Sequence, residues 1–570
     1  MLAAAIPLAL VACAPQAADL FGVRPLPLGL HHLRPIPLAE AMRSGQDLGP
    51  IAASTPITLT LDLIGRDPAG LQALVSSGAH VTTAEYANRF GPDPAAVASV
   101  TTWLQRTDVH AEWRSGSMTL STESTAIAAE NAFNVSVHNF IGPDGTRFRA
   151  PVAPVPVPPQ LRQVVRAVIG FNTYPAMRFS TLTNAAGMRP SDIETIYDIG
   201  PLHSAGLDGT GITVVFPENS APLDNVLSAY ASKWKLPPFG VTVKTDPSLG
   251  PAVGPNDQGF NSVDGETEMD LEIVHAIAPA AKLVVYAGAG NGADQVPKLF
   301  QAIANDFPNN ESRTVIMSSS LGINQCESRQ LQADEMAFDT AWQTMAGHGV
   351  TAYDASGDYG AYCAPGVLGV YPDVASPNVT AVGGTTVFQA ADGGYSSESA
   401  WGDPVDQIGG GGGVSSLFKR PSWQDGPGVT TSLSNGFRQV PDVAGPADPI
   451  SPWSTAVAGS PDPSTVAGSP GDGTSAAAPF WSGITALIYQ DLANKKLTHP
   501  GFIAPVLYAL AQSLNGSASN PFHDVTTGSD LYHAAAPGWD FASGWGSPDA
   551  ARLADALESY QAMHPSGTSP

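Results

Sequence analysis

A serine at the expected start of an apolar helix is the first residue of this sequence that could do chemistry. Ser475 lies in the segment GTSAAAP (residues 473–479), which precedes the apolar residues Phe480, Trp481 and Ile484. The N-terminus of a helix carries partial positive charge, and the preceding glycine allows a tight turn and close approach of a substrate backbone. The same pattern also fits an ordinary serine N-cap. We interpret Ser475 as a candidate nucleophile.

Two acidic residues form the second candidate group. Glu266 and Asp270 lie in the segment ETEMD, and their spacing of four places both on one face of an expected helix over residues 266–277. Carboxylates this close repel each other unless they share a proton, which is the condition for acid–base chemistry at low pH. The alternative is a solvated acidic helix start, which the helix dipole favours.

A third carboxylate follows an expected strand over residues 350–355. Asp358 belongs to the segment ASGDYG, and ligands of parallel sheets bind beyond the carboxyl ends of the strands. Ordinary turn chemistry is the alternative for this aspartate.

The acids near the C-terminus indicate a hard cation. Asp524 and Asp540 are separated by a segment that contains glycines, so carboxylates and backbone carbonyls could surround one ion. Oxygen ligands without cysteine or paired histidine favour calcium over zinc. A glycine-rich turn with an aspartate cap is the alternative.

Several enzyme classes are disfavoured because their motifs are missing. The sequence contains no HExxH, no DTG or DSG, and no GxSxG, which disfavours zincins, pepsin-like peptidases and α/β-hydrolases. No histidine stands in an HGT motif, which weighs against a subtilisin with a histidine base. Two alternatives stay open: a histidine-dependent peptidase that uses His275 or His203, and a catalytically inactive exported binding protein.

Composition limits the partners. The 570 residues include 51 acidic and 26 basic side chains, for a net charge of −25. This balance argues against a nucleic-acid binder, which needs clustered Lys and Arg, and against an anionic membrane surface as partner. The hydrophobic share of 43% supplies a core and excludes a disordered chain. The small number of basic side chains limits positive self-repulsion when the carboxylates are protonated, which is compatible with activity at acidic pH.

The N-terminus and the cysteines indicate export. Residues 2–13 form an apolar run of signal-peptide length, and no stretch reaches the 18 residues of a membrane span. The run ends in LVAC, which resembles a bacterial lipobox with Cys13 as the lipid-bearing residue; a plain removed signal is the alternative. Cys326 and Cys363 remain, and in an exported protein we expect a disulfide rather than a metal site, with free thiols as the alternative.

A proline-rich run divides the chain. Residues 151–159 (PVAPVPVPP) are typical of a stiff linker. Upstream we expect a small α+β domain, with a strand at 57–63, helices at 95–104 and 124–133, and short strands at 109–114, 118–121, 135–139 and 147–148.

Downstream, strands alternate with helices. Residues 191–194 (SDIE) predict a capping box that opens a short helix. We expect strands at 212–216, 282–286, 314–317 and 350–355 and helices at 266–277 and 331–347. This alternation predicts an α/β fold with a parallel sheet and helices on both faces.

Taken together, these segments resemble the sedolisins, the serine-carboxyl peptidases with a subtilisin-like fold. The matching segments, in chain order, are GETEMDLEI (265–273), SGD (356–358), YP and ASP (371–377), GGT (383–385), GGGVS (411–415), PSWQ (421–424), VPDVA (440–444), GTS (473–475) and residues 522–545. The region before the linker is similar to the sedolisin activation domain at FGP (90–92) and WL (103–104).

The resemblance implies a role for each candidate residue. Ser475 would be the nucleophile, Glu266 its general base, Asp270 the partner that orients and shares a proton with Glu266, and Asp358 part of the oxyanion hole. It also implies one calcium ion held by the side chains of Asp524 and Asp540 and the carbonyls of Val525, Ala536 and Gly538. A disulfide between Cys326 and Cys363 would match the one found in some secreted members of this family.

These roles predict activity in acid. A carboxylate base accepts a proton at a pH where histidine would be charged, and Asp358 can donate to an oxyanion only while protonated.

The expected organisation has four parts. Residues 1–18 are a signal or lipoprotein signal, 19–150 an α+β activation domain, 151–189 a linker with the maturation site near 175–190, and 190–570 a sedolisin-like catalytic domain with a subtilisin-like, mostly parallel sheet. We therefore expect a secreted, acid-acting serine-carboxyl endopeptidase, made as a monomeric zymogen whose partners are peptide substrates and its own activation domain.

Overall fold

The computed structural model describes residues 38–143, 145–174, 187–245, 265–288, 295–306, 314–323, 325–458 and 466–564. The expected signal segment with Cys13, and residues 175–186 of the expected maturation region, lie outside the described residues. The N-terminal region comprises residues 38–174, and the C-terminal region comprises residues 187–564.

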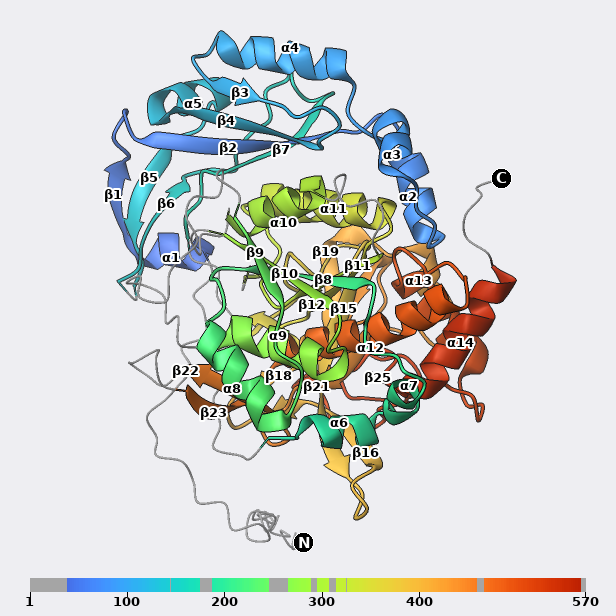
Figure 1. Ribbon diagram of the computed structural model, residues 1–570. Coiled ribbons are helices and arrows are strands. Elements are labelled where there is room, and N and C mark those ends of the chain that lie inside the picture. Colours follow the sequence, from blue (N-terminus) through green and yellow to red (C-terminus); the bar gives the residue numbers. More distant parts are fainter. Residues whose placement is uncertain are drawn as a thin grey trace, which may run out of the picture. The chain divides into compact units, whose positions relative to one another are not determined.

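The N-terminal region is an α+β domain with two antiparallel sheets (Figure 1). One has the order β3-β4-β2-β7 and the other β1-β5-β6. Ile57, Leu59 and Leu61 lie on one face of β2 and are buried, and Thr60 and Asp62 on its other face are buried as well. The elements are α1 (Leu38–Ser44), β1 (Gln46–Pro50), β2 (Pro56–Leu63), α2 (Pro68–Ser76), α3 (Thr83–Arg89), α4 (Pro94–Gln105), β3 (His110–Glu112), β4 (Thr119–Thr125), α5 (Ala126–Phe133), β5 (Val137–Ile141), β6 (Arg147–Pro151) and β7 (Val165–Ile169).

Three local predictions were wrong. Part of the expected linker is strand β7, which pairs with β2 and so completes the sheet. Residues 124 and 125 continue strand β4 rather than open a helix, because they pair with β2 up to Pro56. The helix expected to open with a capping box at residues 191–194 is α6 (Pro190–Ile196). The capping box instead involves Arg189 and Asp192, with the Arg189 backbone N–H donating to the Asp192 carboxylate at 2.9 Å.

The C-terminal region is built on an eight-stranded, mostly parallel sheet. Its order is β16-β15-β12-β11-β8-β10-β9, and β21 also pairs with β15. Within the part of this sheet that the structure describes, only the β15–β16 pair is antiparallel. The strands are β8 (Ile212–Glu218), β9 (Val241–Lys244), β10 (Lys282–Ala287), β11 (Thr314–Ser319), β12 (Thr351–Ala355), β15 (Thr380–Gln389), β16 (Tyr395–Ala400) and β21 (Val443–Pro446). The expected parallel α/β sheet is thereby confirmed.

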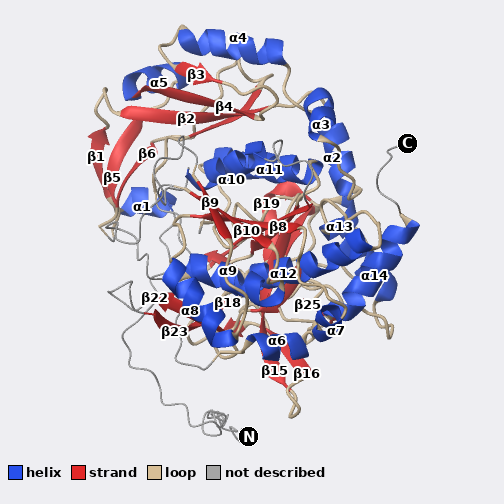
Figure 2. Cartoon of the chain, viewed as in Figure 1, coloured by secondary structure: helices blue, strands red, loops and turns tan. Residues whose placement is uncertain are grey.

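Helices cover both faces of this sheet (Figures 1 and 2). Val214 and Phe216 of β8 face a core shared with α9 (Glu266–Ile277) and α12 (Thr474–Asn494). Val215, which points to the opposite face, joins a second core with α10 (Gln295–Asp306) and α11 (Gln332–Gly347). A strand buried on both faces explains why β8 is apolar at Ile212 and from Val214 to Phe216, with Thr213 as the one polar residue in that stretch.

The remaining elements surround this core. The helices are α7 (Gly200–Ser204), α8 (Asp224–Trp234), α13 (Ala504–Leu514) and α14 (Ala550–Met563), with a 3₁₀ turn at Ser422–Gln424. Two-stranded pairs are β13 (Tyr362–Ala364) with β14 (Val367–Leu368), β17 (Gly402–Asp403) with β18 (Ile408–Gly409), β19 (Gly413–Lys419) with β20 (Phe437–Val440), β22 (Trp453–Ala458) with β23 (Val466–Gly471), and β24 (Phe522–His523) with β25 (Ser547–Pro548).

Helix α11 is also in contact with the N-terminal region. The Thr340 hydroxyl donates to the Asp62 carboxylate at 2.8 Å, and the Tyr86 hydroxyl bonds the Thr344 hydroxyl at 3.1 Å. The N-terminal region therefore docks on the helical layer opposite to α9 and α12.

Candidate active site

Ser475 lies in the first turn of α12, fully buried. The residue before this helix, Gly473, has φ 81°, and a Cβ there would stand 2.6 Å from Oδ2 of Asp358. Glycine at this position is therefore required by the left-handed backbone and by the approach of a carboxyl group. The structure places the candidate nucleophile at a helix N-terminus with Asp358 beside it.

The two acids of α9 are buried. Glu266 is 2% exposed and Asp270 0% exposed, so the solvated acidic helix start is excluded. Gly265 precedes the helix with φ 77°, and a Cβ there would lie 2.2 Å from a methyl carbon of Val457 on β22. Strand β22 thus covers the start of α9, and burial of this kind makes charge on the carboxylates costly without partners.

Ser320 connects Asp270 to Ser475. It follows β11, and its hydroxyl donates to Oδ1 of Asp270 at 3.0 Å and lies 3.1 Å from the backbone carbonyl oxygen of Ser475. A hydroxyl has one proton, so it can donate fully to only one of these oxygens at a time, and a protonated Asp270 could donate to it in return. Ser320 thus bridges the Asp270 carboxyl group and the residue of the candidate nucleophile.

Asp358 follows β12 and is held by Thr474. Its Oδ1 accepts the backbone N–H of Thr474 at 2.7 Å and the Thr474 hydroxyl at 2.9 Å. Burial raises the pKa of Asp358 to about 6, and the two hydrogen bonds offset only part of that increase. Asp358 is thus protonated in acid and can then donate a hydrogen bond.

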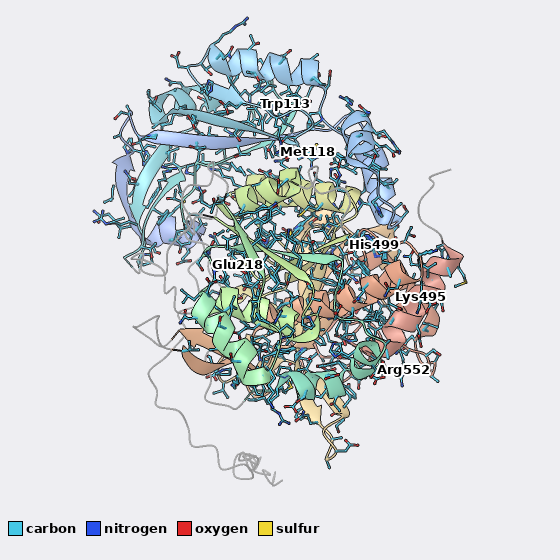
Figure 3. The ribbon with its side chains drawn as sticks, in the orientation of Figure 1. Trp113, Met118, Glu218, Lys495, His499 and Arg552 are labelled. Carbon is cyan, nitrogen blue, oxygen red and sulfur yellow. A yellow bond between two sulfur atoms is a disulfide. The ribbon has the colours of Figure 1, made fainter. Side chains whose placement is uncertain are left out.

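Further acids fix the surroundings of the pair. Glu218, at the end of β8 (Figure 3), accepts the Thr267 hydroxyl at 3.0 Å. Glu268 accepts the Leu223 backbone N–H at 2.7 Å, and Glu272 accepts that of Ala456 at 2.8 Å. These bonds tie α9 to the loop before α8 and to β22, which limits the positions that Glu266 and Asp270 can take.

The histidines proposed as alternative bases have other partners. His275 bonds the Pro237 carbonyl at 2.8 Å and stacks on Phe239 at 3.9 Å. It is nine residues from Glu266, or about 180° around the helix at 100° per residue, so it projects from the opposite side of α9. His203 bonds the Ile277 carbonyl at 2.8 Å and Glu194 at 3.0 Å. Neither arrangement directs the imidazole to Ser475.

Sequence reasoning missed Ser320 and the role of Thr474. Ser320 could have been suspected, because polar residues after a parallel strand lie at the edge where sites form. Thr474 stood inside the GTS segment, but its bonds join residues 116 positions apart, which no local pattern reveals.

The candidate calcium ligands lie in one loop. The Gly538 backbone N–H donates to both oxygens of Asp524 (3.1 and 3.0 Å), and that of Ala536 to Oδ2 of Asp540 (2.7 Å). Both carboxylates thus lie against the turn that supplies two of the expected carbonyls. Two carboxylates with the carbonyls of Val525, Ala536 and Gly538 form an all-oxygen set, which fits calcium. Among the described residues no group of three or more His, Cys, Asp or Glu could hold a metal.

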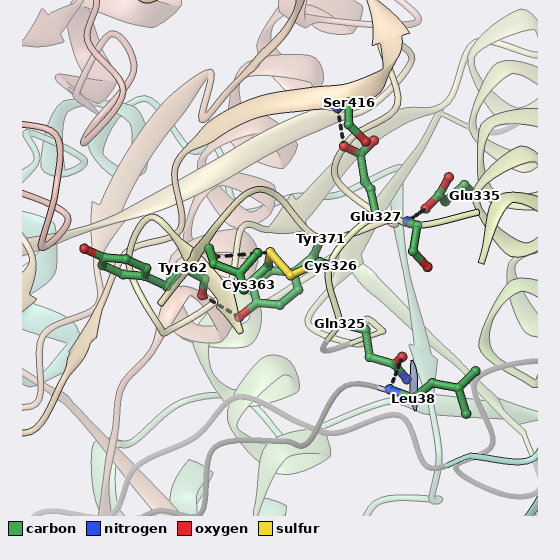
Figure 4. Close-up of a disulfide and its surroundings, with 11 residues drawn as sticks. Leu38, Gln325, Cys326, Glu327, Glu335, Tyr362, Cys363, Tyr371 and Ser416 are labelled. Atoms are coloured by element: carbon green, nitrogen blue, oxygen red, sulfur yellow. Dashed lines mark hydrogen bonds between the residues drawn. A yellow bond between two sulfur atoms is a disulfide. The ribbon is translucent and has the colours of Figure 1, made fainter. Parts of the chain in front are cut away.

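The expected disulfide is present. Cys326 and Cys363 are joined, with their Cα atoms 4.9 Å apart (Figure 4). The bond connects the segment after β11 to β13, close to the Asp358 loop in sequence. Within the part of the chain that is described, we find no helix long and apolar enough to span a membrane.

Comparisons with known proteins identify the family. A family model described as pro-kumamolisin, activation domain, matches residues 43–174, and one described as subtilase family matches residues 252–546. Kumamolisin of Bacillus sp. (strain MN-32) is 31% identical over 459 residues, which cover 75% of this chain and 77% of the relative. Sedolisin of Pseudomonas sp. (strain 101) is 27% identical and covers 92% and 91%.

A solved structure supports the same assignment. Pseudomonas sedolisin, a serine-carboxyl proteinase complexed with pseudo-iodotyrostatin, aligns with a TM-score of 0.53 at 27% identity, over 66% of this chain and 99% of that one. The matched activation domain precedes the matched peptidase domain, as in a peptidase made as a zymogen. The chain therefore belongs to the sedolisin family and is a serine-carboxyl peptidase zymogen with a subtilisin-like catalytic fold.

Proposed function

We propose that this protein is an exported endopeptidase that works in acid through Ser475, Glu266, Asp270 and Asp358. The observation that carries the proposal is the Ser320 hydroxyl, which bonds both the Asp270 carboxylate and the Ser475 carbonyl. This bridge links the Asp270 carboxylate, rather than an imidazole, to the residue of the candidate nucleophile, which supports a carboxylate mechanism.

Each residue then has a defined step. Glu266 takes the proton of the Ser475 hydroxyl as Oγ attacks the carbonyl carbon of the substrate. The oxygen of that carbonyl becomes negative and accepts a hydrogen bond from the protonated Asp358. Glu266 then gives its proton to the leaving amine, the C–N bond breaks, and water hydrolyses the acyl-enzyme by the same steps. Asp270 orients Glu266 and shares its proton.

The pH–rate profile tests this function. Because Asp358 must be protonated to donate and its pKa is raised to about 6, we expect kcat to fall about tenfold per pH unit above that value. The measurement is hydrolysis of a quenched peptide by the mature enzyme between pH 2 and 8. A maximum above pH 7 would contradict the proposal, since a histidine base gains activity in that range.

Maturation is proposed to remove the activation domain before Gly187. Met188 donates its N–H to the Pro452 carbonyl at 2.6 Å and accepts the Ser454 N–H at 2.9 Å, and it belongs to the core around α9 and α12. A Cβ on Gly187 would stand 2.2 Å from the Trp453 carbonyl. These residues belong to the catalytic domain, which favours the N-terminal part of the expected window near residues 175–190.

Calcium is proposed to hold the loop between Asp524 and Asp540 with the carbonyls of Val525, Ala536 and Gly538. A cation there would join two carboxylates that the fold already places against one turn. Removing it with a chelator should lower Tm by about 2–3 °C for a chain of this size, which corresponds to a site occupied at about a hundred times its Kd. Thermal unfolding with and without added calcium measures this, and Asp524→Asn protein should lose the response. An identical Tm under both conditions would refute the calcium site.

The apolar N-terminal segment supports a proposal for the compartment. We propose export, with a lipid on Cys13 as one form of the N-terminus, and a monomer that acts on peptides. The mass of the N-terminal peptide of the exported protein distinguishes an acylated Cys13 from a plain cleaved signal.

A further inference from the structure

Thr474 makes three hydrogen bonds around Asp358. Its backbone N–H and its hydroxyl both reach Oδ1 of Asp358, at 2.7 and 2.9 Å, and the Gly357 backbone N–H reaches the Thr474 hydroxyl at 2.9 Å. All of these atoms are buried. Thr474 therefore joins the loop after β12 to the residue before the nucleophile.

The direction of each bond follows from the chemistry of its atoms. A backbone N–H can only donate, so Gly357 donates to the Thr474 hydroxyl, and the Thr474 N–H donates to Asp358. The hydroxyl accepts from Gly357 and uses its own proton toward Oδ1. Oδ1 thus accepts two hydrogen bonds, and a proton on that oxygen would collide with one of the two donors.

The second oxygen of Asp358 has a different environment. Among the described residues, none is hydrogen-bonded to Oδ2, although Asp358 is only 3% exposed. Oδ2 lies beside Gly473, two residues before Ser475, where a Cβ would stand 2.6 Å from it. A buried polar atom without a protein partner is costly, and Oδ2, at the start of α12, is the oxygen of Asp358 that remains available to bond a substrate.

We infer that Thr474 is a positioning residue that holds Oδ1 of Asp358 as an acceptor and thereby confines the carboxyl proton to Oδ2, on the side of Ser475. The inference rests on the proposed role of Asp358 as a donor to the oxyanion. Without the hydroxyl, the carboxyl group can rotate or carry its proton on either oxygen, and fewer molecules are ready to donate.

The test compares Thr474→Val with Thr474→Ser in the mature enzyme, with rates expressed per active site by burst titration. Valine has nearly the shape of threonine but no hydroxyl, so we expect kcat to fall roughly tenfold with KM little changed. It also removes a donor that favours the ionised form of Asp358, so the alkaline limb of the pH–rate profile should move to higher pH. Serine should restore both properties.

The pH profile separates positioning from a structural role. A merely structural threonine would lower the yield of active sites, or the rate at every pH, without moving the alkaline limb. The inference would be overturned if Thr474→Val enzyme kept the wild-type kcat. It would also be overturned if kcat fell while the alkaline limb of the pH–rate profile stayed in place.

Variants of Asp358 keep the test decisive if Thr474→Val protein fails to fold. In Asp358→Asn the amide oxygen must occupy the Oδ1 position, which places an N–H donor at the Oδ2 position. This enzyme should therefore be at least tenfold faster than Asp358→Ala and should lack the alkaline limb. Equal rates for the Asn and Ala variants, both far below wild type, would overturn the role of Thr474 alone. Asp358→Ala enzyme with wild-type rates would instead overturn the proposed function of Asp358.

Discussion

Ser475→Ala protein is expected to hydrolyse peptides at least about 10⁴-fold more slowly than the wild type and to remain full length after acidification. Alanine leaves the helix start and the Ser320 bond to the residue-475 carbonyl in place, so only the attacking oxygen is removed. The measurements are peptide hydrolysis and the mass of the chain at intervals after the shift to acid.

Ser482→Ala provides a matched control for this variant. Ser482 lies on the same helix and is equally buried, and among the described residues its hydroxyl bonds only the Ala478 carbonyl, at 3.0 Å. Its loss should cost about 1 kcal/mol of stability and leave processing intact, with a mature N-terminus at or before residue 187. Rapid loss of the N-terminal domain from pure Ser475→Ala protein would contradict self-processing.

Glu266→Gln protein should lose activity by about 10³-fold or more, whereas His275→Ala should retain it. Glutamine has the size of glutamate but cannot take the Ser475 proton, so the attack loses its base. His275 lies on the opposite side of α9 and bonds the Pro237 carbonyl, so its removal affects stability and not the proton transfer. The measurement is kcat per active site at the pH optimum.

The paired variants separate two classes of peptidase. A histidine-dependent enzyme would show the reverse result, with His275→Ala inactive and Glu266→Gln active. Full activity in both variants would place the base elsewhere and refute the carboxylate mechanism.

Local patterns predicted the elements that carry the candidate residues. The expected helix at 266–277 coincides with α9, and the expected strand at 350–355 agrees within one residue with β12. Both have strong periodicity or a continuous apolar run, which are the most reliable signals in a sequence. Strand β7 was missed because its short apolar sequence follows a proline run, and its partner β2 lies about a hundred residues earlier.

The candidate nucleophile, the candidate acid pair and Asp358 could be predicted from the sequence, because their segments together resemble the sedolisins, although each local pattern also fits an ordinary helix start or turn. Their chemistry was decided by the tertiary structure. Ser320 reaches Asp270 and the Ser475 carbonyl across 50 and 155 positions, and Thr474 reaches Asp358 across 116. Burial, which raises the pKa of Asp358, and the direction of each hydrogen bond exist only when distant segments pack together, so no local pattern can encode them.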